Sequence, residues 1–194
     1  MDVFLKSSIE EYLKNLSRRS MVPGGGSAAA LTAAIGAGLN LMVINYSLRP
    51  ELTEMKKLQE ESLKRLSFLI DEDCRAFQRL MEALSLKRKA QAEYVAAAGV
   101  PIEICTQAHE SMRVSECLLE HANKNLITDV GCAAWIIKAA FYSAELNVNI
   151  NLKHVEDHFF VKSSQKLLDT MREEIEQAHE KICKYPGLTE QNKM

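Results

Sequence analysis

Residues 21–40 read MVPGGGSAAALTAAIGAGLN, in which three consecutive glycines are followed directly by a run of small residues. A helix built from alanine and glycine has little side-chain bulk, so neighbouring helices can approach it closely from several sides. This stretch predicts a tightly packed helix over residues 27–47, with a low profile that suits the centre of a bundle. The threonine, asparagine and glycines within it favour a buried core helix over a membrane span.

The rest of the chain has the periodicity of helices and few signals for strands. Only 8 glycines and 4 prolines occur in 194 residues, and there are no alternating β-branched runs or Asn-Gly turns. Residues 1–194 are therefore expected to form one all-α domain, an antiparallel helical bundle around the small-residue helix. Apolar spacing predicts helices over residues 4–16, 27–47, 51–84, 89–98, 101–121, 128–152 and 155–184.

Two of these boundaries depend on particular residues. Gly99 and Pro101 predict a break between two helices, with Pro101 in the first turn of the second. Thr128 or Asp129 is expected to cap the helix that ends near residue 152.

Composition limits the classes of partner. The chain is 47% hydrophobic with a formal net charge of −2, so nothing favours nucleic acid or an anionic membrane surface. Five cysteines, odd in number and without a CxxC pair, argue against a disulfide framework or a zinc site. We expect a cytoplasmic protein with reduced cysteines in apolar helical surroundings and no bound metal.

The glycine-rich segment before the small-residue helix has two interpretations. Bare amides at a helix N-terminus carry a partial positive field, and Gly24, Gly25 and Gly26 let a ligand reach the backbone. Alternatively, the glycines only form a tight turn and Ser27 only caps the helix. These residues alone favour neither interpretation.

A carboxylate interrupts the apolar stripe of the long helix over residues 51–84. Asp73 occupies a stripe position, whereas Asp71 and Glu72 lie off the stripe and are expected to be solvated. A core-facing carboxylate has a raised pKa and suits general acid–base catalysis, unless an arginine or lysine pairs with it structurally. The apolar members of the stripe are Leu66, Leu69, Ile70, Phe77, Leu80 and Leu84.

Two asparagines share one face of a later helix. Asn147 and Asn151, in the sequence LNVNINL, are four residues apart and flanked by small residues. Buried amides mostly tie helices together, but they also bind the hydrogen-bonding edge of a heterocycle. Both interpretations stay open.

Taken together, five segments resemble the cyclodeaminase domain of formiminotransferase-cyclodeaminase and its relatives, the methenyltetrahydrofolate cyclohydrolases. They are PGGGSAAAL (23–31), IDEDCRAF (70–77), GVPIEI (99–104), NLITD leading into VGCAA (125–134) and LNVNINL (146–152). The resemblance covers nearly the whole chain. It implies an all-helical homodimer that binds a reduced folate, including polyglutamylated folates, with no cofactor beyond the tetrahydrofolate substrate.

The resemblance also implies roles for particular residues. The catalytic aspartate of the D-x-x-A-F motif falls on Asp73, the same residue that interrupts the apolar stripe. Where relatives often have a Pro-Lys pair, this chain reads Leu86-Lys87-Arg88, which leaves Lys87 to hold the glutamate tail. The implied substrate-binding residues are Gly24, Gly25, Gly26, Ser27, Lys87, Asp129, Asn147 and Asn151.

The implied reaction takes place at the carbon that bridges the two folate nitrogens. A cyclohydrolase adds water to that carbon and opens the ring to formyltetrahydrofolate, whereas a cyclodeaminase closes the ring and releases ammonia. We expect the cyclohydrolase, with the cyclodeaminase as the alternative and Asp73 moving the proton in either. A catalytically silent helical dimerisation module and an enzyme for another one-carbon or amidine substrate also stay open.

Overall fold

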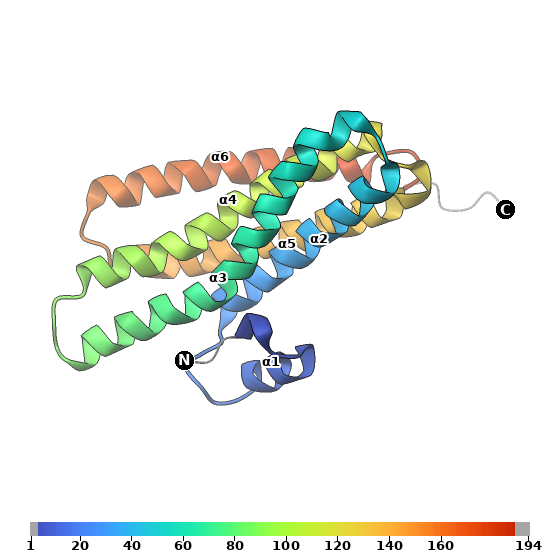
Figure 1. Cartoon of the computed structure of the whole chain (residues 1–194). Coiled ribbons are helices and arrows are strands. Elements are labelled where there is room, and N and C mark those ends of the chain that lie inside the picture. The colour runs from blue at the N-terminus through green and yellow to red at the C-terminus, as the bar shows by residue number, and fades with distance from the viewer. Residues whose placement is uncertain (1–3, 189–194) are drawn as a thin grey trace.

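The computed structural model describes residues 4–188, which form helices joined by short turns (Figure 1). Those residues contain no strand, and the prediction of an all-α antiparallel bundle is confirmed. The predicted single domain also included residues 1–3 and 189–194, which lie outside the described residues. The elements are η1 (Phe4–Lys6), α1 (Ile9–Leu16), α2 (Gly25–Ser47), η2 (Pro50–Leu52), α3 (Thr53–Ser85), α4 (Gln91–His121), η3 (Lys124–Leu126), α5 (Ile127–Leu152) and α6 (His158–Cys183).

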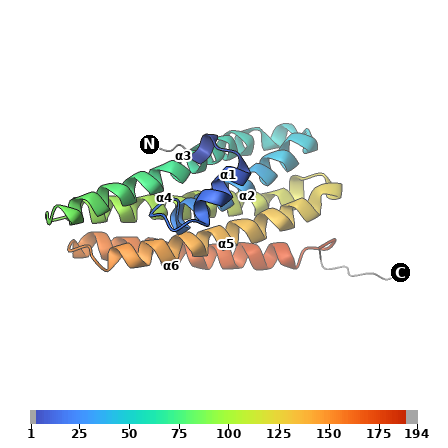
Figure 2. The same ribbon diagram turned by 90° about the horizontal axis from the view of Figure 1, so that it is seen from below.

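The five long helices alternate in direction because short turns join consecutive ones. Helices α3 and α6 lie on opposite sides of the bundle, with α2, α4 and α5 between them (Figure 2). Helix α2 packs against α3, α4 and α5, while α4 contacts all four of the other long helices. Because α2 and α5 are antiparallel, the N-terminal end of α2 lies beside the C-terminal end of α5. This arrangement brings the glycine-rich segment and the two asparagines to the same end of the bundle.

Small residues allow α2 to pack closely against its neighbours, as its sequence predicts. Ala30 and Ala33 are fully buried. A Cβ atom added at Gly36 would lie 2.5 Å from Ile137 Cγ1 of α5, so a side chain at this position would displace Ile137. One face of α2 remains uncovered, since Ile35 is 51% exposed.

A buried polar network also connects α2, α3 and α4. Asn40 Nδ2 donates to the Ser111 carbonyl oxygen at 2.8 Å, and Ser115 Oγ donates to Asn40 Oδ1 at 2.9 Å. Gln59 Nε2 donates to Ser111 Oγ at 3.0 Å. Satisfied buried amides of this kind favour one packing arrangement over its alternatives.

The predicted break at Gly99 and Pro101 is wrong, because α4 runs unbroken through both residues. Proline lacks an N–H group, so Pro101 leaves the Ala97 carbonyl without its helical donor. Asn151 of α5 supplies a replacement, since its Nδ2 donates to the Ala97 oxygen at 2.8 Å. A side chain from the neighbouring helix thus satisfies the freed carbonyl and ties α4 to α5.

Two smaller predictions are also wrong. Helix α5 begins at Ile127 after a short 3-10 turn, so neither Thr128 nor Asp129 is its N-cap. Cys132 is exposed, although Cys74 and Cys105 are buried as expected.

Two helical segments, Gly25–Ser47 and Lys124–Leu152, are long and apolar enough to cross a bilayer by length and composition. The most apolar stretch of the first segment is 56% buried inside the bundle, and that of the second is 39% buried. On α5, Leu146 is 72% exposed.

We predict opposite effects of alanine at two glycines of α2. Gly36→Ala should lower the free energy of unfolding by about 1–3 kcal/mol, because the new methyl group collides with Ile137. Gly38→Ala is the matched control, since a Cβ atom there meets nothing within 4 Å. The control should raise stability by roughly 0.5–1 kcal/mol. Urea unfolding measures both, and equal effects would contradict the close approach of α2 and α5.

Candidate active site

A pocket of about 200 Å³ opens where α2, α3, α4 and α5 meet. It lies at the N-terminal end of α2 and the C-terminal end of α5, beside the middle of α3. Among residues 4–188, Asp73 is the one ionisable side chain in its lining. The lining residues are Met21, Val22, Gly24, Gly25, Gly26, Asp73, Ala76, Phe77, Ala97, Asn147, Ile150 and Asn151.

The first turn of α2 holds the Asp73 carboxylate. The Ser27 amide donates a hydrogen bond to Asp73 Oδ2 at 2.8 Å. Gly24 is the N-cap of α2 and has no side chain that could accept from this amide. Asp73 therefore takes the capping role that a serine or aspartate at the N-cap usually has, although it comes from another helix.

Gly26 permits this contact because its backbone lies directly against the carboxylate. A Cβ atom added at Gly26 would lie 2.0 Å from Asp73 Oδ1 and 2.5 Å from Asp73 Cγ. Any side chain at this position would push the carboxylate away from the helix N-terminus. Neither interpretation of the glycine-rich sequence includes this arrangement, in which the helix N-terminus binds the protein's own carboxylate.

The surroundings of Asp73 make it a group that exchanges protons near neutral pH. Burial raises the pKa of Asp73 to about 6, and the hydrogen bond from the Ser27 amide opposes part of the rise. Among residues 4–188, no lysine or arginine forms an ion pair with Asp73. Arg75 of the same helix pairs with Glu72 instead, at 3.1 Å. The geometry therefore favours the acid–base interpretation of Asp73 over the structural ion pair.

The two asparagines lie in the pocket wall but differ in their contacts. Asn151 is engaged with the Ala97 carbonyl, so its amide has a structural role. Asn147 Nδ2 donates to the Ser143 carbonyl oxygen at 2.8 Å. The Asn147 amide group lies beside Gly25, where a Cβ atom would be 3.5 Å from Nδ2 and 3.7 Å from Oδ1. Asn147 can therefore present its amide oxygen to a ligand in the pocket.

Two residues implied by the resemblance lie away from this pocket. Asp129 is in the first turn of α5, about 27 Å along the helix axis from Asn147 at a rise of about 1.5 Å per residue. Lys87 is exposed in the turn after α3 and does not line the pocket. Sequence reasoning missed several apolar wall residues, because an apolar wall has no motif: Met21, Val22, Ala97 and Ile150.

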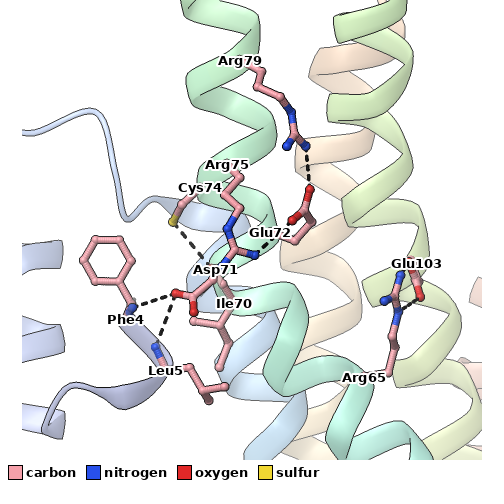
Figure 3. A network of polar contacts seen from close by, with 10 residues as sticks. All are labelled: Phe4, Leu5, Arg65, Ile70, Asp71, Glu72, Cys74, Arg75, Arg79 and Glu103. Atoms are coloured by element: carbon pink, nitrogen blue, oxygen red, sulfur yellow. Dashed lines mark hydrogen bonds and ion pairs between the residues drawn. The ribbon is translucent and has the colours of Figure 1, made fainter. Parts of the chain in front are cut away.

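The expectation that Asp71 is solvated is wrong. Asp71 is only 4% exposed, and its Oδ1 accepts hydrogen bonds from the backbone amides of Phe4 at 2.7 Å and Leu5 at 3.4 Å. Glu72 points to the other side of α3, toward Arg75 and Arg79 (Figure 3). The N-terminal segment covers the face of α3 on which Asp71 lies, and the helical periodicity gives no sign of this cover.

Comparison with known proteins assigns this arrangement to a family. The family model described as formiminotransferase-cyclodeaminase matches residues 8–170. All residues that line the pocket lie within that range.

Individual relatives match over most of the chain. A methenyltetrahydrofolate cyclohydrolase from Methylorubrum extorquens is 31% identical, covering 90% of this chain and 93% of that protein. A formimidoyltransferase-cyclodeaminase from Gallus gallus is 27% identical and covers 86% of this chain, which spans only 34% of that longer protein. A crystal structure of formiminotetrahydrofolate cyclodeaminase from Thermotoga maritima matches with a TM-score of 0.88 at 28% identity, covering 93% of this chain and 96% of that one.

We predict that Asp73→Asn stabilises the fold at about pH 7.5, by on the order of 1–2 kcal/mol. The folded carboxyl binds its proton more tightly than the unfolded one, whose pKa is near 3.8, so wild-type stability falls as pH rises from about 4 to about 6. Asparagine carries no charge, yet its Oδ1 can still accept from the Ser27 amide.

Urea unfolding near pH 7.5 and near pH 4.5 measures this effect, and the advantage of the variant should shrink at the lower pH. A variant that is less stable than wild type near pH 7.5 would show that the attraction of the α2 N-terminus outweighs the desolvation of the carboxylate.

Proposed function

The chain belongs to the formiminotransferase-cyclodeaminase family, and from this premise we propose that it is a methenyltetrahydrofolate cyclohydrolase. One observation carries the proposal: within the described part of the chain, the pocket contains a single acid–base group, Asp73, whose pKa is raised to about 6. The Methylorubrum extorquens relative supports the choice of reaction, since this chain covers 93% of its length.

The reaction needs one group that both removes and returns a proton. The Asp73 carboxylate removes a proton from water as the water oxygen bonds to the methenyl carbon. The resulting carboxylic acid gives that proton to one folate nitrogen as the bond from nitrogen to carbon breaks. The hydroxyl proton leaves to solvent as the formyl C=O forms, so one proton is released per turnover. A pKa near 6 leaves Asp73 ionised at neutral pH and still an effective acid.

The pocket suits the reacting part of a reduced folate. The methenyl group is cationic, so an ionised Asp73 attracts it into the pocket. Phe77 and Ile150 supply apolar walls, while Asn147 and Gly25 offer polar contacts to the edge of a pterin. A volume of about 200 Å³ is below the roughly 300–1,000 Å³ of most ligand pockets, so the folate tail extends outside it.

The second candidate is the cyclodeaminase, which the match to the Thermotoga maritima structure favours. In that reaction a folate nitrogen attacks the formimino carbon and ammonia leaves. Asp73 takes the proton from the attacking nitrogen and gives it to the departing one. Both reactions use the same carboxyl group, so they differ in substrate and not in machinery.

Absorbance of methenyltetrahydrofolate with the purified chain separates the candidates. Loss faster than the uncatalysed hydrolysis supports the cyclohydrolase. Growth of the same absorbance from formiminotetrahydrofolate, without accelerated loss, supports the cyclodeaminase. No change in either assay favours a silent module or an enzyme for a different substrate, and in neither case should reduced folate raise the thermal stability of the chain.

We predict that Asp73→Asn lowers kcat by about 10²–10⁴-fold, because asparagine neither takes nor returns a proton. The wild-type rate should rise with pH through an inflection near 6 and then level off, since the ionised carboxylate is the base. Glu72→Gln is the control, because Glu72 is a neighbouring carboxylate that pairs with Arg75 and Arg79 outside the pocket. A near-normal rate for Asp73→Asn would remove Asp73 from the mechanism.

We also propose that the chain forms a homodimer through the uncovered faces of α2 and α5. Ile35 is 51% exposed, and Leu146 and Ile150 are 72% and 52% exposed. Leu146 and Ile150 are four residues apart, so they share one face of α5. Exposed apolar surface of this kind supports association with a partner.

We predict that the wild-type chain sediments with the mass of a dimer and that Leu146→Glu sediments as a monomer, because the charge cannot be buried in an apolar interface. Leu58→Glu on α3 is the control, since Leu58 is 52% exposed but lies on neither α2 nor α5. If Leu58→Glu dissociates the dimer and Leu146→Glu does not, the interface lies elsewhere. A monomeric wild type would contradict the dimer.

A further inference from the structure

Ser27 lies between Asp73 and the N-terminal segment, which is defined here as residues 4–16. Its amide donates to Asp73 Oδ2 at 2.8 Å, and its Oγ shares a hydrogen bond with the Tyr12 hydroxyl at 3.1 Å. Ser27 is fully buried and Tyr12 is 5% exposed, so this bond is shielded from solvent. One serine therefore connects a side chain of α1 to the carboxylate in the pocket.

The N-terminal segment is itself fixed to α3 by a buried carboxylate that the proposed mechanism does not use. Asp71 accepts the Phe4 amide at 2.7 Å and the Leu5 amide at 3.4 Å (Figure 3). The Phe4 ring then packs edge-on against the Tyr12 ring, with centroids 6.2 Å apart. Asp71 thus anchors Phe4, and Phe4 packs against the tyrosine that contacts Ser27.

We propose that Tyr12 is a positioning residue, which fixes Ser27 and thereby the amide that holds the Asp73 carboxylate. Tyr12 does not line the pocket and acts only through Ser27. The inference rests on the proposed function, in which Asp73 is the acid–base group.

The need for such a residue follows from the sequence of the first turn of α2. Gly25 and Gly26 precede Ser27, and glycines restrict the backbone less than any other residue. Gly26 cannot be replaced by a stiffer residue, because a Cβ atom would collide with Asp73. The hydrogen bond from Tyr12 to Ser27 supplies from outside the turn the restraint that the turn lacks.

Loss of this restraint should raise the pKa of Asp73. A Ser27 amide that is less well fixed stabilises the ionised Asp73 carboxylate less, so the equilibrium shifts toward the protonated carboxyl. Among the described residues, the titratable groups around this contact are Tyr12 of α1 and Asp71 and Cys74 of α3. The pocket residues that α4 and α5 contribute carry no charge.

Titration of the Asp73 carboxyl in the full chain by carbon-13 NMR tests the inference without any substrate. The Asp73 resonance is identified by its absence from Asp73→Asn. Tyr12→Phe, which removes only the hydroxyl, should raise the pKa by about 0.5–1 unit. Ser27→Ala should give a similar rise and the double variant no further rise, because both substitutions remove the same hydrogen bond.

Tyr142→Phe is the matched control. Its hydroxyl donates to Glu176 of α6, and Tyr142 does not line the pocket. The control should lower the unfolding midpoint and leave the pKa of Asp73 unchanged. An unchanged pKa in Tyr12→Phe, or an equal rise in the control, would overturn the inference.

Kinetics separate failure of the inference from failure of the proposed function. With methenyltetrahydrofolate, Tyr12→Phe should lower kcat by roughly fivefold to tenfold with little change in KM. The inflection near pH 6 in the pH–rate profile should move to higher pH as the pKa of Asp73 rises. A wild-type chain without activity, combined with the NMR shift, overturns the proposed function alone. If the wild type is active and the inflection of its pH–rate profile is unchanged in Tyr12→Phe, only the positioning role of Tyr12 is overturned.

Discussion

The hydrogen bond from the Ser27 amide to the Asp73 carboxylate is the contact on which the rest of the arrangement depends. Helix α2 has no side chain at its N-cap, and α3 has a half-buried carboxylate at Asp73. One hydrogen bond of 2.8 Å therefore satisfies a free amide of α2 and stabilises a half-buried charge on α3. The same hydrogen bond orients the carboxyl group of Asp73 in the pocket. One contact therefore contributes both to the packing of α2 against α3 and to the acid–base chemistry of the site.

Much of this structure could be predicted from local patterns. The run of alanine and glycine predicts α2, and the helical period of residues 51–84 makes Asp73 stand out as a carboxylate on an apolar stripe. The same helical periodicity predicts that Asp71 is solvated, and this prediction is wrong. Periodicity identifies the side of a helix that faces the main core, but it does not show that a separate short segment covers another side.

The remaining errors come from contacts between residues distant in sequence. Pro101 predicts a helix break because a proline removes a local donor, whereas the donor that replaces it belongs to Asn151 on another helix. Asp129 and Lys87 entered the predicted site through resemblance and not through geometry, and they lie away from the pocket. The apolar wall of the pocket has no sequence signature, since its members are ordinary core residue types.

The spacing of Asp71 and Asp73 has a mechanical consequence for α3. At about 100° per residue, residues two apart in sequence are separated by about 200° around the helix axis. The two carboxylates therefore accept hydrogen bonds on nearly opposite sides of α3. Any axial rotation of α3 would therefore pull both from their amides at once. The turn that carries the acid–base group is thus restrained against twisting on two sides, and its orientation depends on Phe4 and Leu5 as well as on the first turn of α2.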